Sequence, residues 1–449
     1  MPQNDILPEI VKSWIFAIVT NIIYSMKSLI LYNRLKKNKL FKDSFWALTG
    51  TVVGKSLSLL AGILVVRFLG KEIYGEYGMI KSTLLNISIF TTLGLGYTGT
   101  RFISKFLIDN KYLVRDIIRK IYIVTSLFSG FIMILLFIFS EQVALYIEAP
   151  DTASAFRFTA FIVLINAVNT SQIGILAGLK AFKHTAINNS ITGVITFICS
   201  VVLTFYMGLE GSLLALLLSL GIGCILNMCS INKLIKDIPY EKTDKTFNKE
   251  LLFFSMPIAI QELLFSAVSW SSSLLVVKYS TYGELGILGV VGQWTAIILF
   301  IPGVLKNVAL SYFSSDNSMN LFKKLIYINF LSSCIPCFFV AVFSVPIMKL
   351  YGNSFVDNSH WILVIGVFST IFNSVSSIII YEFISQGKTI LMLIVRIIRE
   401  TTVLLFIWLG LYLNSSYGAY IVVISQLCVY VLFTICIYIL SRKFLFNKK

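Results

Sequence analysis

Long apolar segments separated by short polar stretches follow one another along most of the chain. Each is about 20 residues long, the length at which an α-helix crosses the hydrocarbon of a bilayer. The pattern predicts about twelve membrane-spanning helices. They extend near residues 45–67, 77–98, 119–140, 156–178, 186–207 and 212–233, and then near 251–276, 285–311, 325–348, 361–383, 389–412 and 418–440.

The longest polar connection divides this series into two halves. It contains Asp237, Pro239 and Asp244 and follows the sixth apolar segment. Because each half has an even number of spans, the halves would be pseudo-symmetric parallel repeats. The predicted units are a six-helix bundle at 44–234, a cytoplasmic linker at 235–250, a second six-helix bundle at 251–441 and a basic tail at 442–449.

Two short sequences support the repeat. Tyr74-Gly75-Glu76-Tyr77-Gly78 follows Val65-Val66-Arg67, and Tyr282-Gly283-Glu284-Leu285-Gly286 follows Val276-Val277-Lys278. Each copy closes one apolar segment and opens the next. The pattern indicates that both halves descend from one unit, as in many transporters.

Residues 1–43 precede the first predicted bundle. The apolar stretch 13–26 lies between Lys12 and Lys27 and is short for a span. Its polar and apolar side chains fall on opposite helical faces, which is typical of a helix lying in the membrane interface. We favour that helix, with a thirteenth span through residues 11–32 as the alternative. A cleavable signal peptide is not expected, because no basic start and no small-residue cleavage site flank the stretch.

Composition supports the membrane class. The hydrophobic fraction is 57% and the charged fraction 13%, whereas soluble domains have about 25% charged residues. An all-α integral membrane protein is therefore predicted. The formal net charge of +16 is attributed to basic loops on one membrane side rather than to nucleic-acid binding, because no soluble domain of sufficient size is visible.

Lysine and arginine residues concentrate in every second connection. The basic set includes the linker and the connection after the second span, with Arg101, Lys105, Lys111 and Arg115. The opposite set has few cations and contains Glu141, Glu148 and Asp151. Because cytoplasmic loops carry the excess of Lys and Arg, both termini are predicted to be cytoplasmic.

Residues suited to catalysis or metal binding are sparse. The two histidines, His184 and His360, are far apart in sequence, and Cys334-Ile-Pro-Cys337 lies inside an apolar run, where buried thiols are the simpler interpretation. No hydrolase triad, phosphate-binding glycine loop or large loop with paired carboxylates is visible. We predict no enzymatic activity, no metal and no cofactor.

Ionisable residues deep inside predicted spans are the main functional candidates. They are Lys55, Glu262, Arg396, Arg399 and Glu400, and such groups usually face a wet cavity or a partner. Lys55, Arg396 and Arg399 would form a cationic cavity for an anionic headgroup, because arginine suits phosphate. The alternative is structural ion pairing of Arg396 with Glu400, or of Lys55 with Glu262. Either glutamate could instead take part in coupling.

Three further charged residues fall near the ends of predicted spans. They are Lys81, Arg157 and Glu382. Long side chains at such positions can extend their charged groups to the interface. We expect these three side chains at the membrane surface.

The first hundred residues resemble a known family. Phe45–Gly78 places Arg67, Leu69, Gly70, Glu72 and then Tyr74-Gly75 at the end of one span and the start of the next, and Gly94-Leu95-Gly96 follows. Ser255-Met-Pro257 matches the proline near the start of the family's second half. In these motifs, and in its span pattern over 44–441, the chain is similar to the polysaccharide transporters. These are O-antigen-type flippases of the multidrug/oligosaccharidyl-lipid/polysaccharide exporter superfamily.

The resemblance implies two six-helix bundles around a central cavity in the bacterial cytoplasmic (inner) membrane. It implies a flippase that moves a polyprenyl-diphosphate-linked oligosaccharide, such as an O-antigen or lipopolysaccharide repeat unit, from the inner to the outer leaflet. The family's cationic lumen would correspond to Lys55, Arg396 and Arg399. Expected partners are the lipid bilayer, this substrate, and the polysaccharide polymerase and glycosyltransferases of the same pathway. The alternative is a multidrug or small-solute exporter of the same superfamily.

Overall fold

The computed structural model describes residues 39–241, 245–303, 319–355, 359–385 and 388–442. All regular secondary structure in these ranges is helical, so the predicted all-α fold is confirmed. By length and composition, six helical stretches within them could cross a membrane. The total of about twelve spans stays a prediction. The predicted interfacial helix and the basic tail lie almost entirely outside the described residues.

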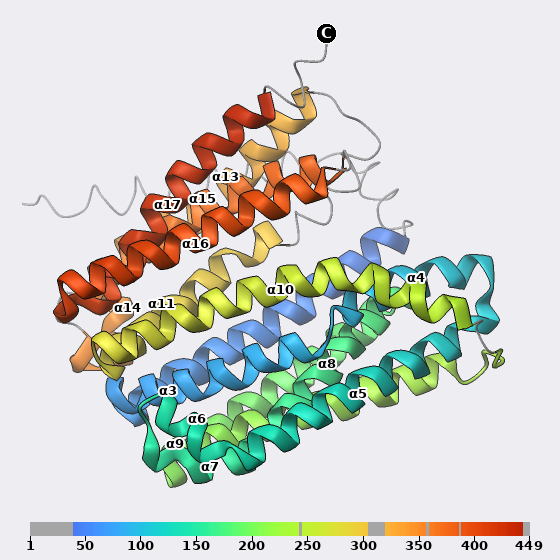
Figure 1. Cartoon of the computed structure of the whole chain (residues 1–449), viewed down its shortest axis with the longest axis horizontal. Helices are drawn as coiled ribbons and strands as arrows, with labels where there is room; N and C mark the ends of the chain where they lie inside the picture. Colours follow the sequence, from blue (N-terminus) through green and yellow to red (C-terminus); the bar gives the residue numbers. More distant parts are fainter. Residues whose placement is uncertain (1–38, 242–244, 304–318, 356–358, 386–387, 443–449) are drawn as a thin grey trace, which may run out of the picture.

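The helices of the first half pack around α8, which contacts α3, α4, α5 and α9. This half occupies the lower, blue-to-green part of Figure 1. Its elements are α3 (Lys39–Thr91), α4 (Leu95–Asp109), η1 (Lys111–Leu113), α5 (Val114–Ile138), α6 (Ser140–Tyr146), η2 (Pro150–Thr152), α7 (Ala153–Thr159), α8 (Phe161–Gly178) and α9 (Phe182–Ile235).

In the second half α15 packs against α13 and α17, and α16 packs against α10 and α17. The orange and red helices form the upper part of Figure 1, with α10 and α11 between them and the first half. The elements are α10 (Lys245–Tyr279), α11 (Tyr282–Ile298), α13 (Met319–Val342), α14 (Ser344–Tyr351), η3 (Asn353–Phe355), α15 (Ser359–Ser385), α16 (Thr389–Leu413), η4 (Ser415–Tyr417) and α17 (Gly418–Ser441).

Two of these elements, α3 and α9, are hairpins of two helices. Each reverses at one glycine with positive φ, Gly70 (φ 73°) in α3 and Gly208 (φ 55°) in α9. The hydroxyls of Thr204 and Ser212 lie 2.9 Å apart, although eight residues of straight helix would span about 12 Å. Glycine allows this turn because it has no Cβ to oppose a positive φ. The connections predicted between the first and second spans and between the fifth and sixth spans are thus each reduced to a single non-helical residue.

Amide side chains join helices inside the first half. Asn227 donates to the Oδ1 of Asn169 on α8 at 2.9 Å, and Asn188 donates to the Oδ1 of Asn227 at 2.8 Å. Asn188 and Asn227 belong to opposite arms of α9. Hydrogen bonds between buried amides hold membrane helices together, since lipid provides no competing partner.

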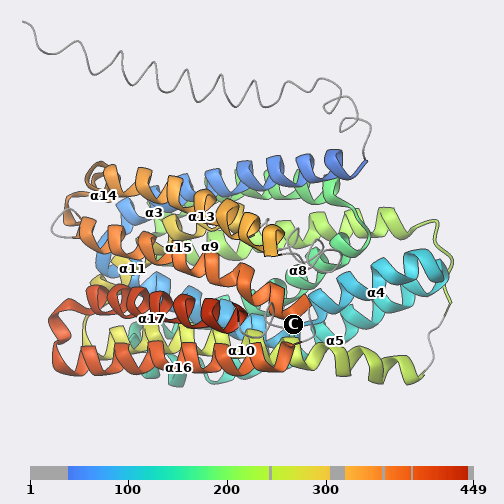
Figure 2. The same ribbon diagram turned by 90° about the horizontal axis from the view of Figure 1, so that it is seen from above.

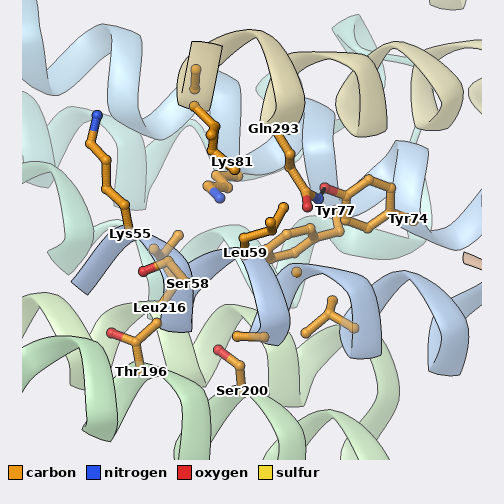
Figure 3. A pocket seen from close by; sticks show the side chains of 15 residues that line it. Lys55, Ser58, Leu59, Tyr74, Tyr77, Lys81, Thr196, Ser200, Leu216 and Gln293 are labelled. Atoms are coloured by element: carbon orange, nitrogen blue, oxygen red, sulfur yellow. Dashed lines mark hydrogen bonds between the residues drawn. The ribbon is translucent and has the colours of Figure 1, made fainter. Parts of the chain in front are cut away.

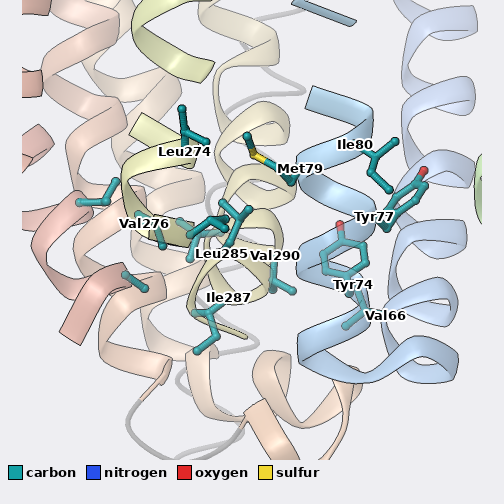
Figure 4. Close-up of a cluster of buried hydrophobic side chains, with 14 of the residues drawn as sticks. Val66, Tyr74, Tyr77, Met79, Ile80, Leu274, Val276, Leu285, Ile287 and Val290 are labelled. Atoms are coloured by element: carbon teal, nitrogen blue, oxygen red, sulfur yellow. The ribbon is translucent and has the colours of Figure 1, made fainter. Parts of the chain in front are cut away.

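The two halves meet where the repeated sequences lie. Helix α3 contacts α10 and α11, and Figure 4 shows the buried side chains of this contact. Val66 lies in the valine pair before one repeat and Val276 in the valine pair before the other, and both are fully buried. They belong to one continuous hydrophobic cluster that contains side chains of both halves.

The helices run between two ends of the molecule, and Figure 2 shows their arrangement from above. The end that bears the Gly70 and Gly208 reversals also carries α6, α7 and α14. At the opposite end, many exposed lysine and arginine side chains lie where helices begin or end. We call this end of the molecule the basic end. These cations include Lys105, Lys111, Arg119, Lys180, Lys183, Lys233, Lys236, Lys323, Lys324 and Arg442.

Candidate functional site

A cavity of about 360 Å³ lies between α3, α9 and α11, and we call it the lysine cavity (Figure 3). Both arms of the α3 hairpin line it, together with α9 and one helix of the second half. Its lining residues are Lys55, Ser58, Leu59, Ala61, Gly62, Val65, Tyr74, Tyr77, Lys81, Thr196, Ser200, Leu216, Gln293, Ala296 and Ile297.

Lys55, one of the three cations expected to line a central cavity, is among the residues that line this one. It stands 15 residues before the Gly70 reversal, about 22 Å along the helix. Its Nζ lies 4.8 Å from the centroid of the Phe300 ring. An ammonium group over an aromatic face is attracted by the ring quadrupole. The side chain of Glu262 is not among those the structure describes, so the Lys55–Glu262 pair stays a prediction.

Lys81 extends into the same cavity, as Figure 3 shows, and is half-buried. The expectation that it reaches the membrane surface was therefore wrong. The second arm of α3 begins directly after Gly70, so Lys81 lies about 16 Å along that arm rather than near its end. Its Nζ lies 5.4 Å from the centroid of the Tyr77 ring. The depth of Lys81 follows from the reversal at the single residue Gly70, which the hydropathy pattern does not indicate.

Polar side chains from both halves form one wall of the lysine cavity. Gln293 donates to the hydroxyl of Tyr74 at 2.7 Å, and Tyr351 donates to the Oε1 of Gln293 at 3.3 Å. Trp294 donates to the hydroxyl of Tyr351 at 3.0 Å. The chain of bonds fixes Gln293 against the cavity and links α3, α11 and α14.

The charge of the lysine cavity is positive. Its lining contains two lysines, and no carboxylate is present among the lining residues that the structure describes. Ser58 and Thr196 contribute neutral hydroxyl groups to the lining, and each hydroxyl donates to a carbonyl of its own helix, that of Gly54 or of Thr192. Two ammonium groups from opposite arms of one hairpin therefore line a single space, a lining suited to an anionic ligand.

The two arginines of the predicted cavity lie elsewhere. Arg399 is 5% exposed and forms an ion pair with Glu400, with its Nε 3.0 Å from the Oε1 of Glu400. Its guanidinium also stacks on Tyr430 and Phe433, at 5.2 and 5.1 Å from the ring centroids. Arg399 is thus neutralised inside the second half. The partner of Glu400 is its neighbour in sequence rather than Arg396.

Arg396 lies at the edge of a small void of about 30 Å³ that Glu400 also lines. Its guanidinium is 6.0 Å from the centroid of the Phe265 ring, and its buried Nε has no hydrogen-bond partner in the described part of the chain. The structure therefore groups Arg396, Arg399 and Glu400 and places Lys55 in a separate cavity with Lys81.

A second cavity, of about 410 Å³, lies between the halves, and we call it the serine cavity. Helices α3, α10, α11, α15, α16 and α17 all contribute to it. Its polar lining consists of Ser82, Ser269, Ser272, Ser273, Thr295, Glu400, Gln426 and Tyr430. Glu400 thus belongs both to the ion pair with Arg399 and to the lining of this cavity. The serine cavity was not predicted from the sequence.

The remaining charged and thiol residues have structural surroundings. Glu382 is 1% exposed, so the expectation that it reaches the surface was wrong. Arg157 is exposed and pairs with Glu141. All seven cysteines are free thiols. Within the described ranges no three metal-ligating side chains cluster.

The family model described as "Polysaccharide biosynthesis protein" matches residues 40–314, more than half of the 449-residue chain. The chain belongs to this family. The resemblance inferred from Arg67, Leu69, Gly70 and the following motif is thereby confirmed. An uncharacterized membrane protein of Methanocaldococcus jannaschii is 27% identical to this family member over 241 residues. That alignment covers 49% of the chain and 55% of the relative, so the chain matches about half of the curated relative's length.

Solved structures share the fold. An inward-facing multidrug resistance MATE family transporter of the MOP superfamily matches 90% of the chain and 100% of its own length, with a TM-score of 0.73 and 13% identity. The lipid II flippase MurJ in an inward closed conformation matches 87% of the chain and 86% of its own length, with a TM-score of 0.67 and 17% identity. This member of the polysaccharide biosynthesis family is therefore a multi-pass membrane protein with the transporter fold of that superfamily.

Proposed function

We propose that the protein is a flippase for a polyprenyl-diphosphate-linked oligosaccharide. The cargo would be a repeat unit of O-antigen or a related surface polysaccharide. The observation that carries this proposal is the lysine cavity, where Lys55 and Lys81 face one space that no described carboxylate lines. Membership of the polysaccharide biosynthesis family supports the same class of cargo.

The chemistry of the cargo explains why such a cavity is needed. A diphosphate cannot leave water for about 30 Å of hydrocarbon without a large loss of hydration energy. Two ammonium groups and nearby hydroxyls can replace that hydration, while the prenyl chain stays in lipid. Transport would then require the cavity to open to each side in turn.

The moving parts would be the two bundles at 44–234 and 251–441, joined by the linker at 235–250. Rocking of one bundle against the other would separate α3 from α10 and α11, which form the contact between the halves. The protein would lie in the bacterial cytoplasmic membrane with both termini in the cytoplasm. Glycosyltransferases of the pathway would assemble the repeat unit before transport, and the polymerase would act on it after transport.

The arginines keep a secondary place in this proposal. Arg396, whose Nε has no partner in the described part of the chain, would assist phosphate binding when the halves move. Glu400 and Glu262 are the candidates for coupling to an ion gradient. Of the two, Glu400 pairs with Arg399, so a proton gained by Glu400 would release Arg399. An exporter of cationic drugs is less well supported, since the serine cavity's carboxylate is already paired.

Reconstituted vesicles provide the test. With a fluorescent polyprenyl-diphosphate oligosaccharide, we expect Lys55→Ala and Lys81→Ala each to slow transfer between leaflets by about tenfold or more, the factor that corresponds to losing about 1.4 kcal/mol of binding. Lys349→Ala is the matched control, because Lys349 is exposed and lines neither cavity. Unchanged transfer in both cavity variants would refute the proposal.

A further inference from the structure

A groove lies on the outer face of the second half, away from both central cavities. It measures about 320 Å³ and opens between α13, α15 and α17. Its lining consists of Lys323, Ile326, Tyr327, Phe330, Val375 and Tyr438. The start of α13 and the end of α17 lie side by side near the top of Figure 1. The groove therefore reaches the basic end of the molecule.

Two cations frame the mouth of the groove. Lys323 is exposed and lines it, and the guanidinium of Arg442 lies 5.3 Å from the centroid of the Tyr438 ring. Neither cation forms an ion pair with a residue that the structure describes. Glu382, on the same helix as Val375, is buried and does not line the groove. The mouth thus has a positive charge that the described residues do not neutralise.

The rest of the groove is largely apolar and exposed on the outside of the helices. Tyr327 and Phe330 are 61% and 40% exposed, and they follow Lys323 along one side of α13. Phe330 lies about 10 Å deeper along the helix axis than Lys323. A ligand that fits both parts has an anionic group at the membrane surface and a hydrocarbon chain that extends inward.

We propose that this groove binds an anionic glycerophospholipid of the leaflet at the basic end. The lipid phosphate would lie between Lys323 and Arg442, and one acyl chain would lie against Tyr327 and Phe330. Basic pockets between membrane helices on the cytoplasmic side are suited to anionic headgroups. A zwitterionic lipid would fill the apolar part equally well but bring no net charge to the two cations. The proposal is independent of the cargo proposed for the central cavity.

Native mass spectrometry of the full chain, with phosphatidylglycerol and phosphatidylcholine of the same acyl chains, tests the site. We expect preferential retention of phosphatidylglycerol. Its affinity should fall about tenfold or more in Lys323→Gln/Arg442→Gln, since this variant removes both cations at the mouth of the groove. The control is Lys233→Gln/Lys236→Gln, which removes the same charge from exposed positions at the basic end of the first half. The control should change affinity less than about twofold.

Two results would overturn the proposal. Equal losses in both double variants would mean general attraction to the basic end rather than a site. Equal retention of the two lipids by the unaltered protein would mean that the groove does not select a headgroup. Soluble glycerol 3-phosphate provides a further arm, because it has the phosphate without the chain. It should not displace phosphatidylglycerol, and efficient displacement would assign the cations to a free anion instead.

Discussion

Gly75 of α3 and Gly286 of α11 lie in direct backbone contact. A Cβ on Gly75 would be 1.8 Å from the carbonyl oxygen of Tyr282 and 3.2 Å from the backbone nitrogen of Gly286. A Cβ on Gly286 would be 2.2 Å from the carbonyl oxygen of Lys71. Small residues allow such close helix crossing. The two copies of the repeated sequence therefore hold the halves together at the end that carries Gly70.

Gly75→Val should loosen this contact. Overpacking costs about 1–3 kcal/mol, and about 1.4 kcal/mol changes an equilibrium tenfold. In a variant whose seven cysteines are replaced, Ser82→Cys reports access to the serine cavity. We expect an impermeant maleimide added outside the cell to label that thiol about tenfold faster when Gly75→Val is present.

Gly130→Val in α5 provides the matched control. A Cβ on Gly130 meets no atom within 4 Å, and Gly130 lines neither cavity, so this substitution changes helix propensity without separating α3 from α11. We expect labelling at the rate of the protein in which both glycines are unaltered. Equal labelling in the Gly75 and Gly130 variants would contradict the idea that this crossing closes the outer end.

Glu400→Leu should destabilise the protein more than Arg399→Met/Glu400→Leu. The single substitution leaves the buried Arg399 guanidinium without its carboxylate, and losing one partner of a buried pair costs about 3–5 kcal/mol. The double substitution replaces both charges by apolar groups of similar size and is close to neutral. Thermal unfolding in detergent measures the difference. A double variant that unfolds earlier than the single one would show that the pair itself stabilises the fold.

Gly208→Ala should destabilise the α9 reversal by about 1–2 kcal/mol, because only glycine adopts its backbone conformation readily. No atom lies within 4 Å of a Cβ at Gly208, so the loss would come from the backbone alone. Gly221→Ala, in the helical second arm of α9, has equally open surroundings. It should be neutral or stabilising by up to about 1 kcal/mol. Equal unfolding temperatures for the two variants would exclude the backbone explanation.

Reporter fusions test the orientation in the membrane. A fusion at Lys242, in the basic linker, should be active as a cytoplasmic reporter, and one at Glu148 should be active outside the cytoplasmic membrane. The physical reason is that basic connections remain on the cytoplasmic side. Measured alkaline phosphatase and β-galactosidase activities distinguish the two. The reverse pattern would invert the topology and the leaflet assigned to the lipid groove.

The apolar segments predicted the helical fold, because a backbone in lipid must satisfy its hydrogen bonds internally and a helix does so within one segment. The repeated motif likewise indicated two related halves. What the pattern could not give was the length of the reversals. Gly70 and Gly208 turn the chain within one residue, and this depends on a backbone conformation rather than on hydropathy.

The candidate site was predicted in part. Lys55 is a deep cation by its place in an apolar segment, and the structure puts it in a cavity. Arg399 is equally deep in sequence but is paired with Glu400. Depth along a helix can be counted from sequence, whereas the direction of a side chain depends on the helices around it.

The sequence by itself determined the membrane class, the helical segments, the repeat and the presence of buried charges, since each follows from the cost of placing polar groups in hydrocarbon. Tertiary structure alone decided that Lys81 joins Lys55, that Arg399 joins Glu400, and that the repeats touch at Gly75 and Gly286. Lys81 and Lys55 lie on different arms of one hairpin, and Gly75 and Gly286 lie in opposite halves. The pairing of Arg399 with Glu400 depends on the direction in which a buried side chain points. Only packing, acting over long sequence separations, selects among the partners that local pattern allows.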